Sequence, residues 1–458
     1  MQNGNAFEMA LALTRYGFVI REIYANLGPD DFVYLRHLAQ LSPDTQVYSN
    51  LSPSMLYYRG QDHPVDVTIG KDAAYYHEQA AHLSWDEDIQ PFGYAGVISL
   101  LQRLEQALLE RKHPWKGLWK YISPFAPDDS GAAAVLYGLN GIVVICDAGG
   151  CAGNICGFDE PRWFSGKKSA VFSAGLRDMD AILGRDDRLV DKLCQAAETI
   201  DADFAAIVGT PVPSVIGTDY KALKHMAEKK LSIPVVTVDT TGMDYYDKGI
   251  EKAYDALFPV LADPSQQAEA DTVGVLGAVP LELMHPGDIE WISQSLVEDG
   301  WQQILLFDEI DDYRKAGKAS LNLVLSPAGL KAAQYLQKTF GTPYELHYFG
   351  LDAVVDFDDN LFSGKNVLII HQAVAASAMA AMAEEAGAAY VTTASWFMGL
   401  PEPQGTDCVR LREEDDLRRL ADNDQFDIIL GDAYFRRALP NFHGQYVDFP
   451  HFAVSGRG

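Results

Sequence analysis

The chain has 458 residues, of which 48% are hydrophobic, and carries a formal net charge of −28. This charge argues against binding to nucleic acid, whose phosphates would be repelled, and against anionic membrane surfaces. The length predicts about three or four domains, and no apolar run reaches the roughly 18 residues that a membrane-spanning helix needs.

One pattern repeats along the chain from about residue 141: an apolar strand, a turn that contains glycine, and an amphipathic helix. Apolar runs that predict strands lie at 141–146, 204–208, 233–238, 271–279, 302–307, 365–370 and 426–430. Stretches between them predict helices at 177–200, 216–230, 285–300 and 326–341. Strands that alternate with helices of this length predict an α/β fold of several Rossmann-like domains with parallel sheets.

Three of the five cysteines lie five residues apart, in the glycine-rich stretch GIVVICDAGGCAGNICGF. Cys146, Cys151 and Cys156 would lie at the carboxyl end of a buried strand and in the turn after it, where open α/β sheets bind ligands. Clustered thiolates suit a soft metal centre, most often iron–sulfur or zinc. The alternative is that they are small buried hydrophobic residues, and Cys146 fits that alternative best. An odd number of clustered cysteines does not suggest a disulfide framework. Together with a start that lacks a secretory signal, this predicts a cytoplasmic protein.

Several segments, in order, resemble the nitrogenase component 1 proteins, the molybdenum–iron-protein superfamily. They are PFAPDDSGAAAVLYGLNGIVVICDAGGCAGN, SAVFSAGLRDMDAIL, IVGTPVPSVIGTDYKAL, IPVVTVDTTGMDYYDKGIEKAY and, further on, GKNVLIIHQAVAASAMAAMAEEAGA. The resemblance covers about residues 117–458. It implies a cluster-bearing Rossmann-like domain at 117–262, a second at 263–362 and a third at 363–458.

The front of the chain resembles the same family out of order. VDVTIGKDAAYYH and IQPFGYAGVISLLQRLEQALLERKHPW look like the last strand and closing helix of a component 1 chain. We therefore expect residues 1–116 to be a Rossmann-like module that resembles the terminal domain, displaced or duplicated.

The chain also departs from the family pattern. Cys151 is kept, but Asp128, Asp129 or Ser130 replaces the family's first cluster cysteine, and Pro211 replaces a later one. No cysteine lies near 318–322, where the catalytic nitrogenase subunit anchors its cofactor. A molybdenum–iron cofactor and nitrogen fixation are therefore not expected.

The resemblance instead implies one iron–sulfur cluster, of the 4Fe-4S type, bound by Cys146, Cys151 and Cys156. A fourth ligand would come from Asp147, from a partner subunit or from nothing. The amides of Gly149, Gly150 and Gly153 would tune the cluster by hydrogen bonding. The family further implies an oligomer with a component 1-like chain and an ATP-dependent iron protein as reductase. Substrate would lie in the cleft between the domains.

Other candidate residues are weaker, and two functions remain open. His371 is better interpreted as structural, Cys194 and Cys408 as core residues, and neither His443 nor His451 as a ligand. The chain lacks a Walker-type phosphate loop and a GxGxxG dinucleotide motif. The first function is a nitrogenase-like oxidoreductase subunit that transfers electrons. The alternative is a non-catalytic scaffold or carrier of a metallocofactor or small molecule.

Overall fold

The computed structural model describes residues 119–163, 168–177, 184–355, 361–401, 408–423 and 426–456, together with four short strands nearer the N-terminus. The chain divides into two units, Met1–Lys116 and Gly117–Gly458. In the first unit, β1 (Glu22–Tyr24) pairs in parallel with β2 (Gln46–Tyr48), and β3 (Val67–Ile69) with β4 (Ala81–Leu83). The rest of the predicted N-terminal module lies outside the described residues.

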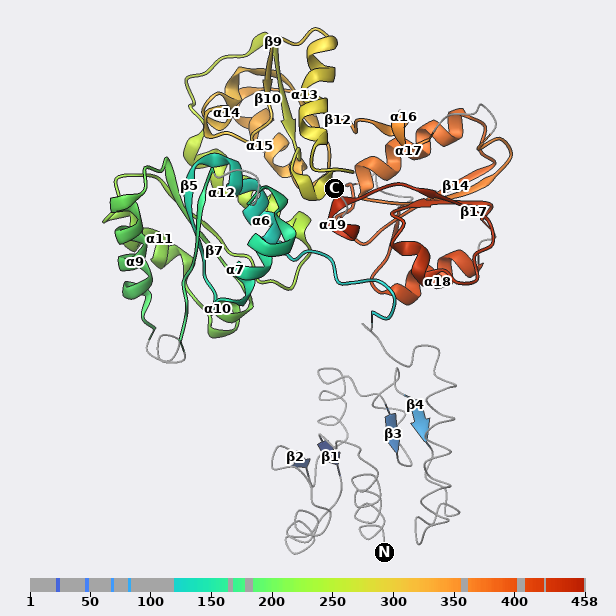
Figure 1. The fold of residues 1–458 in the computed structure, drawn as a ribbon, viewed down its shortest axis with the longest axis horizontal. Coiled ribbons are helices and arrows are strands. Elements are labelled where there is room, and N and C mark those ends of the chain that lie inside the picture. The colour runs from blue at the N-terminus through green and yellow to red at the C-terminus, as the bar shows by residue number, and fades with distance from the viewer. Residues whose placement is uncertain are drawn as a thin grey trace, which may run out of the picture. The chain divides into compact units, whose positions relative to one another are not determined.

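Three parallel sheets follow one another in the second unit, which confirms the predicted α/β class (Figure 1). Their orders are β6-β5-β7-β8, β10-β9-β11-β12 and β15-β14-β13-β16-β17. The first sheet contains β5 (Gly141–Ile145), β6 (Ala170–Ser173), β7 (Phe204–Val208) and β8 (Val235–Val238). The second contains β9 (Glu269–Leu276), β10 (Gln303–Leu305), β11 (Ala319–Val324) and β12 (Tyr344–Leu346). The third contains β13 (Asn366–Ile370), β14 (Tyr390–Ser395), β15 (Cys408–Arg410), β16 (Ile428–Gly431) and β17 (Gln445–Asp448).

We call the parts built on these sheets the first lobe (119–261), the second lobe (269–354) and the third lobe (366–455). Helices of the first lobe are α6 (Asp128–Leu136), α7 (Gly150–Asn154), α9 (Asp186–Thr199), α10 (Pro211–Ile216), α11 (Tyr220–Glu228) and α12 (Tyr246–Leu261). Those of the second are α13 (Asp288–Glu298), α14 (Ile310–Arg314), α15 (Leu330–Phe340) and α16 (Leu351–Val354). Those of the third are α17 (Ala373–Glu385), α18 (Glu414–Asn423) and α19 (Phe452–Ser455). The predicted domain boundaries at 262/263 and 362/363 stay predictions. No helix among the described residues combines the length and the apolar character needed to span a membrane.

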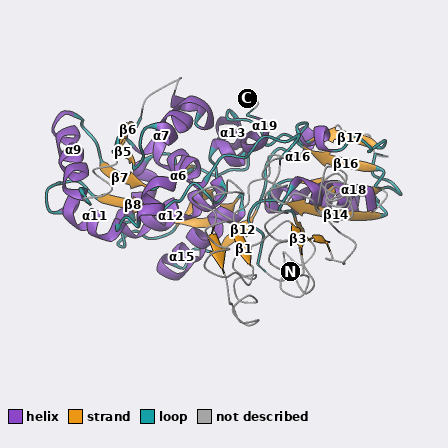
Figure 2. Cartoon of the chain, turned by 90° about the horizontal axis from the view of Figure 1, so that it is seen from below, coloured by secondary structure: helices purple, strands orange, loops and turns teal. Residues whose placement is uncertain are grey.

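The central strands of the first lobe are covered on both faces. Every residue of β5 and β7 is buried. One face packs against α9 and α11, and the other against α6 and α12 (Figure 2). Because both faces of the sheet are covered, the sequences of both strands are continuously apolar instead of alternating between apolar and polar residues.

Helices α6 and α12 approach each other closely because each carries a glycine at the contact. A Cβ atom on Gly131 would lie 1.8 Å from the carbonyl oxygen of Tyr246, and one on Gly249 would lie 1.7 Å from that of Asp128. Only glycine leaves room for the backbones to meet. This contact fixes the start of α6 against the rest of the first lobe.

The three sheets share one topology. In each, the first strand along the chain lies inside the sheet, and later strands are added on both of its sides. The switch points therefore fall at the carboxyl ends of β5 and β7, of β9 and β11, and of β13 and β16. Such points are where open α/β sheets form ligand-binding crevices.

Candidate metal-cluster site

The turn after β5 forms the first of these crevices. Gly149 adopts φ +120°, a left-handed conformation that favours glycine. Gly149, Gly150 and Gly153 are exposed, and a Cβ atom at any of them would meet nothing within 4 Å. The backbone of the turn is therefore open to an approaching group.

Cys146 lies at the foot of the turn and belongs to the core. Its side chain is 1% exposed and packs with Ile142 and Val144 on the face covered by α9 and α11. Burial, with Asp186 and Asp147 nearby, raises the pKa of its thiol to about 12. The Cys146 carbonyl accepts a hydrogen bond of 2.8 Å from the hydroxyl of Thr210. Such a thiol is poorly suited to bind metal, which requires loss of the proton.

Cys151 lies where three segments of the first lobe meet. It is half-buried on α7 and packs against the core on the α6 and α12 side. Its thiol pKa is raised by burial first and then by Asp129 and Asp147, while the Thr210 hydroxyl lowers it. Asp129, at the start of α6, is 2% exposed, and its Oδ1 atom is buried without a hydrogen-bond partner. Burial and the adjacent Asp128 raise the pKa of Asp129 to about 6.

Cys156 lies one turn further on, in the π-helical segment Ile155–Asp159. It is half-buried, and burial followed by Glu160 raises the pKa of its thiol. Across the described part of the chain, no group of three or more His, Cys, Asp or Glu side chains is arranged to hold a metal ion. The structure therefore does not bring the three cysteines together into one ligand set.

Asp147 shapes the turn from inside. It is 1% exposed, and its Oδ2 atom accepts a hydrogen bond of 2.9 Å from the amide of Ala152. Its Oδ1 atom accepts one of 2.5 Å from the hydroxyl of Ser173. Because both oxygens are engaged within the lobe, Asp147 positions α7 instead of facing an approaching ligand.

These residues fit part of an iron–sulfur ligand set. Cys151 and Cys156 are accessible, and exposed amides of the glycine turn surround them. A cubane cluster takes about four ligands. One chain therefore supplies an incomplete site, and Cys146 does not add to it.

Three large apolar side chains are strongly exposed on segments that follow β5, β7 and β8. Phe158, Val215 and Met243 are 80%, 87% and 82% exposed. Met243 also borders an open groove of about 170 Å³. The groove is lined by Trp119, Pro124, Phe125, Pro127, Gly242, Met243, Asp244 and Tyr245.

The crevices of the second and third lobes contain different chemistry, which the sequence did not reveal. His371 follows β13 directly and stacks on His451, with ring centroids 4.3 Å apart and an interplanar angle of 15°. Both rings are buried, and burial lowers the pKa of His371 to about 4. Glu282 and Tyr246 complete the cluster. The hydroxyl of Tyr246 donates a hydrogen bond of 3.2 Å to the Oε2 atom of Glu282. Nothing in the spacing of these residues along the chain predicts this contact.

Fold and site together define a class: an α/β protein of three parallel-sheet lobes, with a cysteine-bearing glycine turn at the switch point of the first. Residues 129–361, just over half of the chain, match the family described as Nitrogenase component 1 type Oxidoreductase. The chain belongs to this family, which confirms the resemblance drawn from the sequence.

Individual relatives agree with this assignment. The chain is 26% identical over 187 residues to the nitrogenase iron-molybdenum cofactor biosynthesis protein NifE of Clostridium pasteurianum, covering 40% of each chain. It is 23% identical over 226 residues to the nitrogenase molybdenum-iron protein alpha chain of the same organism, covering 45% of this chain and 41% of the relative. The matches thus span about two fifths of the length of these relatives. The solved structure of nitrogenase Cp1 at pH 6.5 superimposes with a TM-score of 0.58 at 14% identity, over 73% of this chain and 87% of that one, and so shares the fold.

Proposed function

We propose that this chain is a nitrogenase component 1-like oxidoreductase subunit that holds a 4Fe-4S cluster at the turn after β5. Cys151 carries the proposal, because α6, α7 and the turn after β7 converge on its thiol. Cys156 is the second ligand, since it is accessible on the same turn. This proposal leaves out Cys146, the third predicted ligand, because its thiol is buried in the core.

The remaining ligands come from a second chain of the same kind. Two copies that met at the turn would bring two accessible thiols each, which makes the four that a cubane takes. The exposed Phe158, Val215 and Met243 would be buried in such a contact. The proposal therefore links the metal site to the oligomer: the cluster needs thiols from two chains, and the two chains associate around the cluster.

A bound cluster supplies one-electron transfer, and the residues of this chain prepare its site. Burial, Asp129 and Asp147 raise the pKa of the Cys151 thiol, and the Thr210 hydroxyl offsets part of that rise. Asp147 holds α7 in place through Ala152 and Ser173. The amides of Gly149 and Gly150, at the exposed start of α7, would hydrogen-bond to sulfide. Electrons would arrive from an ATP-dependent iron protein and leave for a substrate bound by the complex.

A carrier of a metallocofactor is the second candidate. Two of the relatives are named as cofactor biosynthesis proteins, which is a role in assembly. Pro211 cannot ligate metal, and Lys318 to Asn322 contain no cysteine. A subunit that lacks these anchors could still hold a cluster briefly at Cys151 and Cys156 and pass it on.

The test is iron and acid-labile sulfide per chain after strictly anaerobic purification, with electron paramagnetic resonance after dithionite reduction. We expect about four irons per two chains and a dimer by light scattering. Cys151→Ser and Cys156→Ser should each lose the iron, while Cys194→Ala, a matched change of a half-buried cysteine on α9, should keep it. A folded chain that stays free of iron after reconstitution would overturn the proposal.

The two candidates differ in how the cluster is reduced. An oxidoreductase subunit should be reduced by an ATP-dependent iron protein only when MgATP is present. A carrier should show the same iron content, no response to the iron protein and MgATP, and loss of iron to a chelating acceptor protein within minutes.

A further inference from the structure

The segment Phe449–Ser455, which ends in α19, is inserted where the three lobes meet (Figure 1). Phe449 and His451 are almost fully buried. The amide of Phe452 donates a hydrogen bond of 3.0 Å to the carbonyl of Leu283 in the second lobe. The ring of His451 reaches the first lobe, since its Nε2 atom lies 2.8 Å from the hydroxyl of Tyr246. One short segment thus touches all three lobes.

The two stacked histidines at the centre of this contact are held in the neutral form. His371 accepts a hydrogen bond of 2.9 Å at Nδ1 from the amide of Gln372, so its proton is on Nε2, which lies 3.0 Å from the carbonyl of Pro450. His451 Nε2 also lies 3.1 Å from the carbonyl of Leu281, and its Nδ1 atom is buried without a partner. Burial lowers the pKa of both rings, and His371 further lowers the pKa of His451.

Neither ring forms a hydrogen bond with a carboxylate among the described residues. Glu282 on the second lobe has its pKa raised to about 8 by burial, so it is uncharged at neutral pH. Asp432 accepts hydrogen bonds from the amides of His451 and Tyr434 and from the hydroxyl of Ser455. Asp247 on α12 accepts from the amides of Met398 and Lys248. Tyr246 and Tyr348, the remaining titratable groups against the rings, are neutral phenols.

We propose that Phe449–Ser455 is an acid-released latch, which closes the junction of the three lobes while His371 and His451 are neutral and leaves it when they are protonated. Protonation would place a cation, 4.3 Å from the other ring, in a buried site where neither ring is hydrogen-bonded to a carboxylate. The open form, in which the rings reach water, removes that cost.

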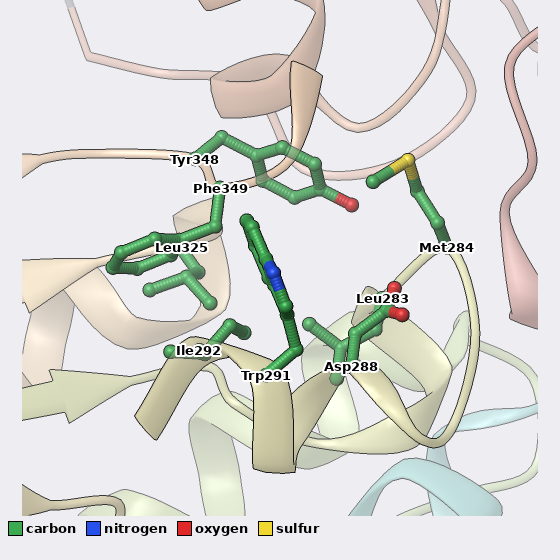
Figure 3. A pocket seen from close by; sticks show the side chains of 8 residues that line it. All are labelled: Leu283, Met284, Asp288, Trp291, Ile292, Leu325, Tyr348 and Phe349. Atoms are coloured by element: carbon green, nitrogen blue, oxygen red, sulfur yellow. The ribbon is translucent and has the colours of Figure 1, made fainter. Parts of the chain in front are cut away.

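Release of the latch would open a pocket in the second lobe. Leu283 and Tyr348, which the latch and His371 contact, also line a cavity of about 10 Å³ with Met284, Asp288 and Trp291 (Figure 3). In the closed form this cavity has room for about one water molecule. Trp291 is already 44% exposed and Asp288 partly exposed, so release of Leu283 and Tyr348 would widen the cavity beside them.

Hydrogen–deuterium exchange of the full-length protein tests the latch. With a pKa of about 4 for His371 in the closed form and about 6.5 for a solvated histidine, titration of His371 alone should make opening about 30-fold more favourable from pH 7.5 to pH 5. After correction for intrinsic rates, the amides of 449–455 should lose protection by at least that factor, because the pKa of His451 is lowered as well, while β13 and β16 stay protected. His371→Gln should reduce the pH response, the double variant His371→Gln/His451→Asn should remove it, and His443→Gln, at an exposed position of the same lobe, should leave it unchanged.

Two results would overturn the latch. One is protection at 449–455 that stays the same at pH 5 and pH 7.5. The other is loss of protection that is equal throughout all three sheets, which is global unfolding. If His371→Gln does not fold, His451→Asn is the second variant, and its 449–455 segment should keep only the response of His371, about 30-fold between pH 7.5 and pH 5; a response as large as that of the wild type would overturn the role of His451.

Discussion

Two crevices of this protein occupy the same topological position and differ in almost every property. The crevice after β5 is open, and its turn contains three glycines and two accessible thiols. The junction formed after β9 and β13 is closed, and aromatic and imidazole rings fill it. Both lie at the carboxyl ends of strands where the sheet order switches.

The loops explain the difference. A glycine turn held from within by Asp147 leaves its own backbone exposed, so a ligand can approach it. The loops of the junction carry Glu282, His371 and His451, which hydrogen-bond to the Tyr246 hydroxyl and to backbone groups and leave Glu282 Oε1 and His451 Nδ1 buried without a partner. The fold fixes where a site can form, and loop chemistry determines whether that place is a site or a core.

The largest expected effect comes from breaking the support of the open crevice. Gly249→Val should prevent folding of the first lobe, a loss above about 4 kcal/mol, because the new Cβ would lie 1.7 Å from the carbonyl oxygen of Asp128. Soluble yield and thermal unfolding by circular dichroism measure it. Gly153→Ala is the matched control, since a Cβ there meets nothing within 4 Å. Equal melting temperatures for the two variants would contradict this account of α6 and α12.

An intermediate effect should come from the closed junction. Glu282 keeps its proton in the folded protein up to a pKa of about 8 but loses it near 4.5 when unfolded. The unfolded chain therefore binds fewer protons between these values, and the contribution of Glu282 to stability falls as the pH rises from 4.5 to 8. Glu282→Gln should remove that slope and raise stability at pH 8, by on the order of 1–3 kcal/mol.

Thermal unfolding of wild type and Glu282→Gln at pH 5, 6, 7 and 8 measures this difference. The difference in melting temperature between the two proteins should increase steadily with pH. A constant gap would mean that Glu282 is ionised in the folded protein, and the junction would then contain a charge that could stabilise a protonated His451.

The order of strands and helices could be predicted because each lobe repeats a local pattern. The apolar run that ends at Cys146 predicted β5, and the glycines after it predicted the turn. The side of the sheet on which Cys146 lies could not be predicted, because both faces of β5 are covered by apolar residues. Strand alternation places Cys146 with Ile142 and Val144, but only the packing of α9 and α11 shows that this face is closed.

The closed junction could not be predicted from the sequence, for a different reason. His371 and His451 are 80 positions apart, and Tyr246 comes from another lobe, so no spacing links them. His371 was expected to be structural, although it follows an apolar strand at a position where open sheets present ligand-binding groups. Its stacking partner and the neutral state of both rings depend on how the lobes pack. Glu282 gave no signal, since a single glutamate in a proline-rich turn is ordinarily exposed.

The smallest effects should separate the cysteines without any metal. Cys146→Ser places a hydroxyl in the core and should cost about 1–3 kcal/mol, whereas Cys151→Ser in the metal-free protein should change stability by less than about 0.5 kcal/mol. Thermal unfolding after chelation measures both variants. The ordering follows from exposure, because Cys146 is sealed under α9 and α11 and Cys151 is half-buried on an open turn. If Cys151→Ser proved the more destabilising change, its thiol would be a core group held by Asp129 and Thr210, and the open crevice would lose its main ligand.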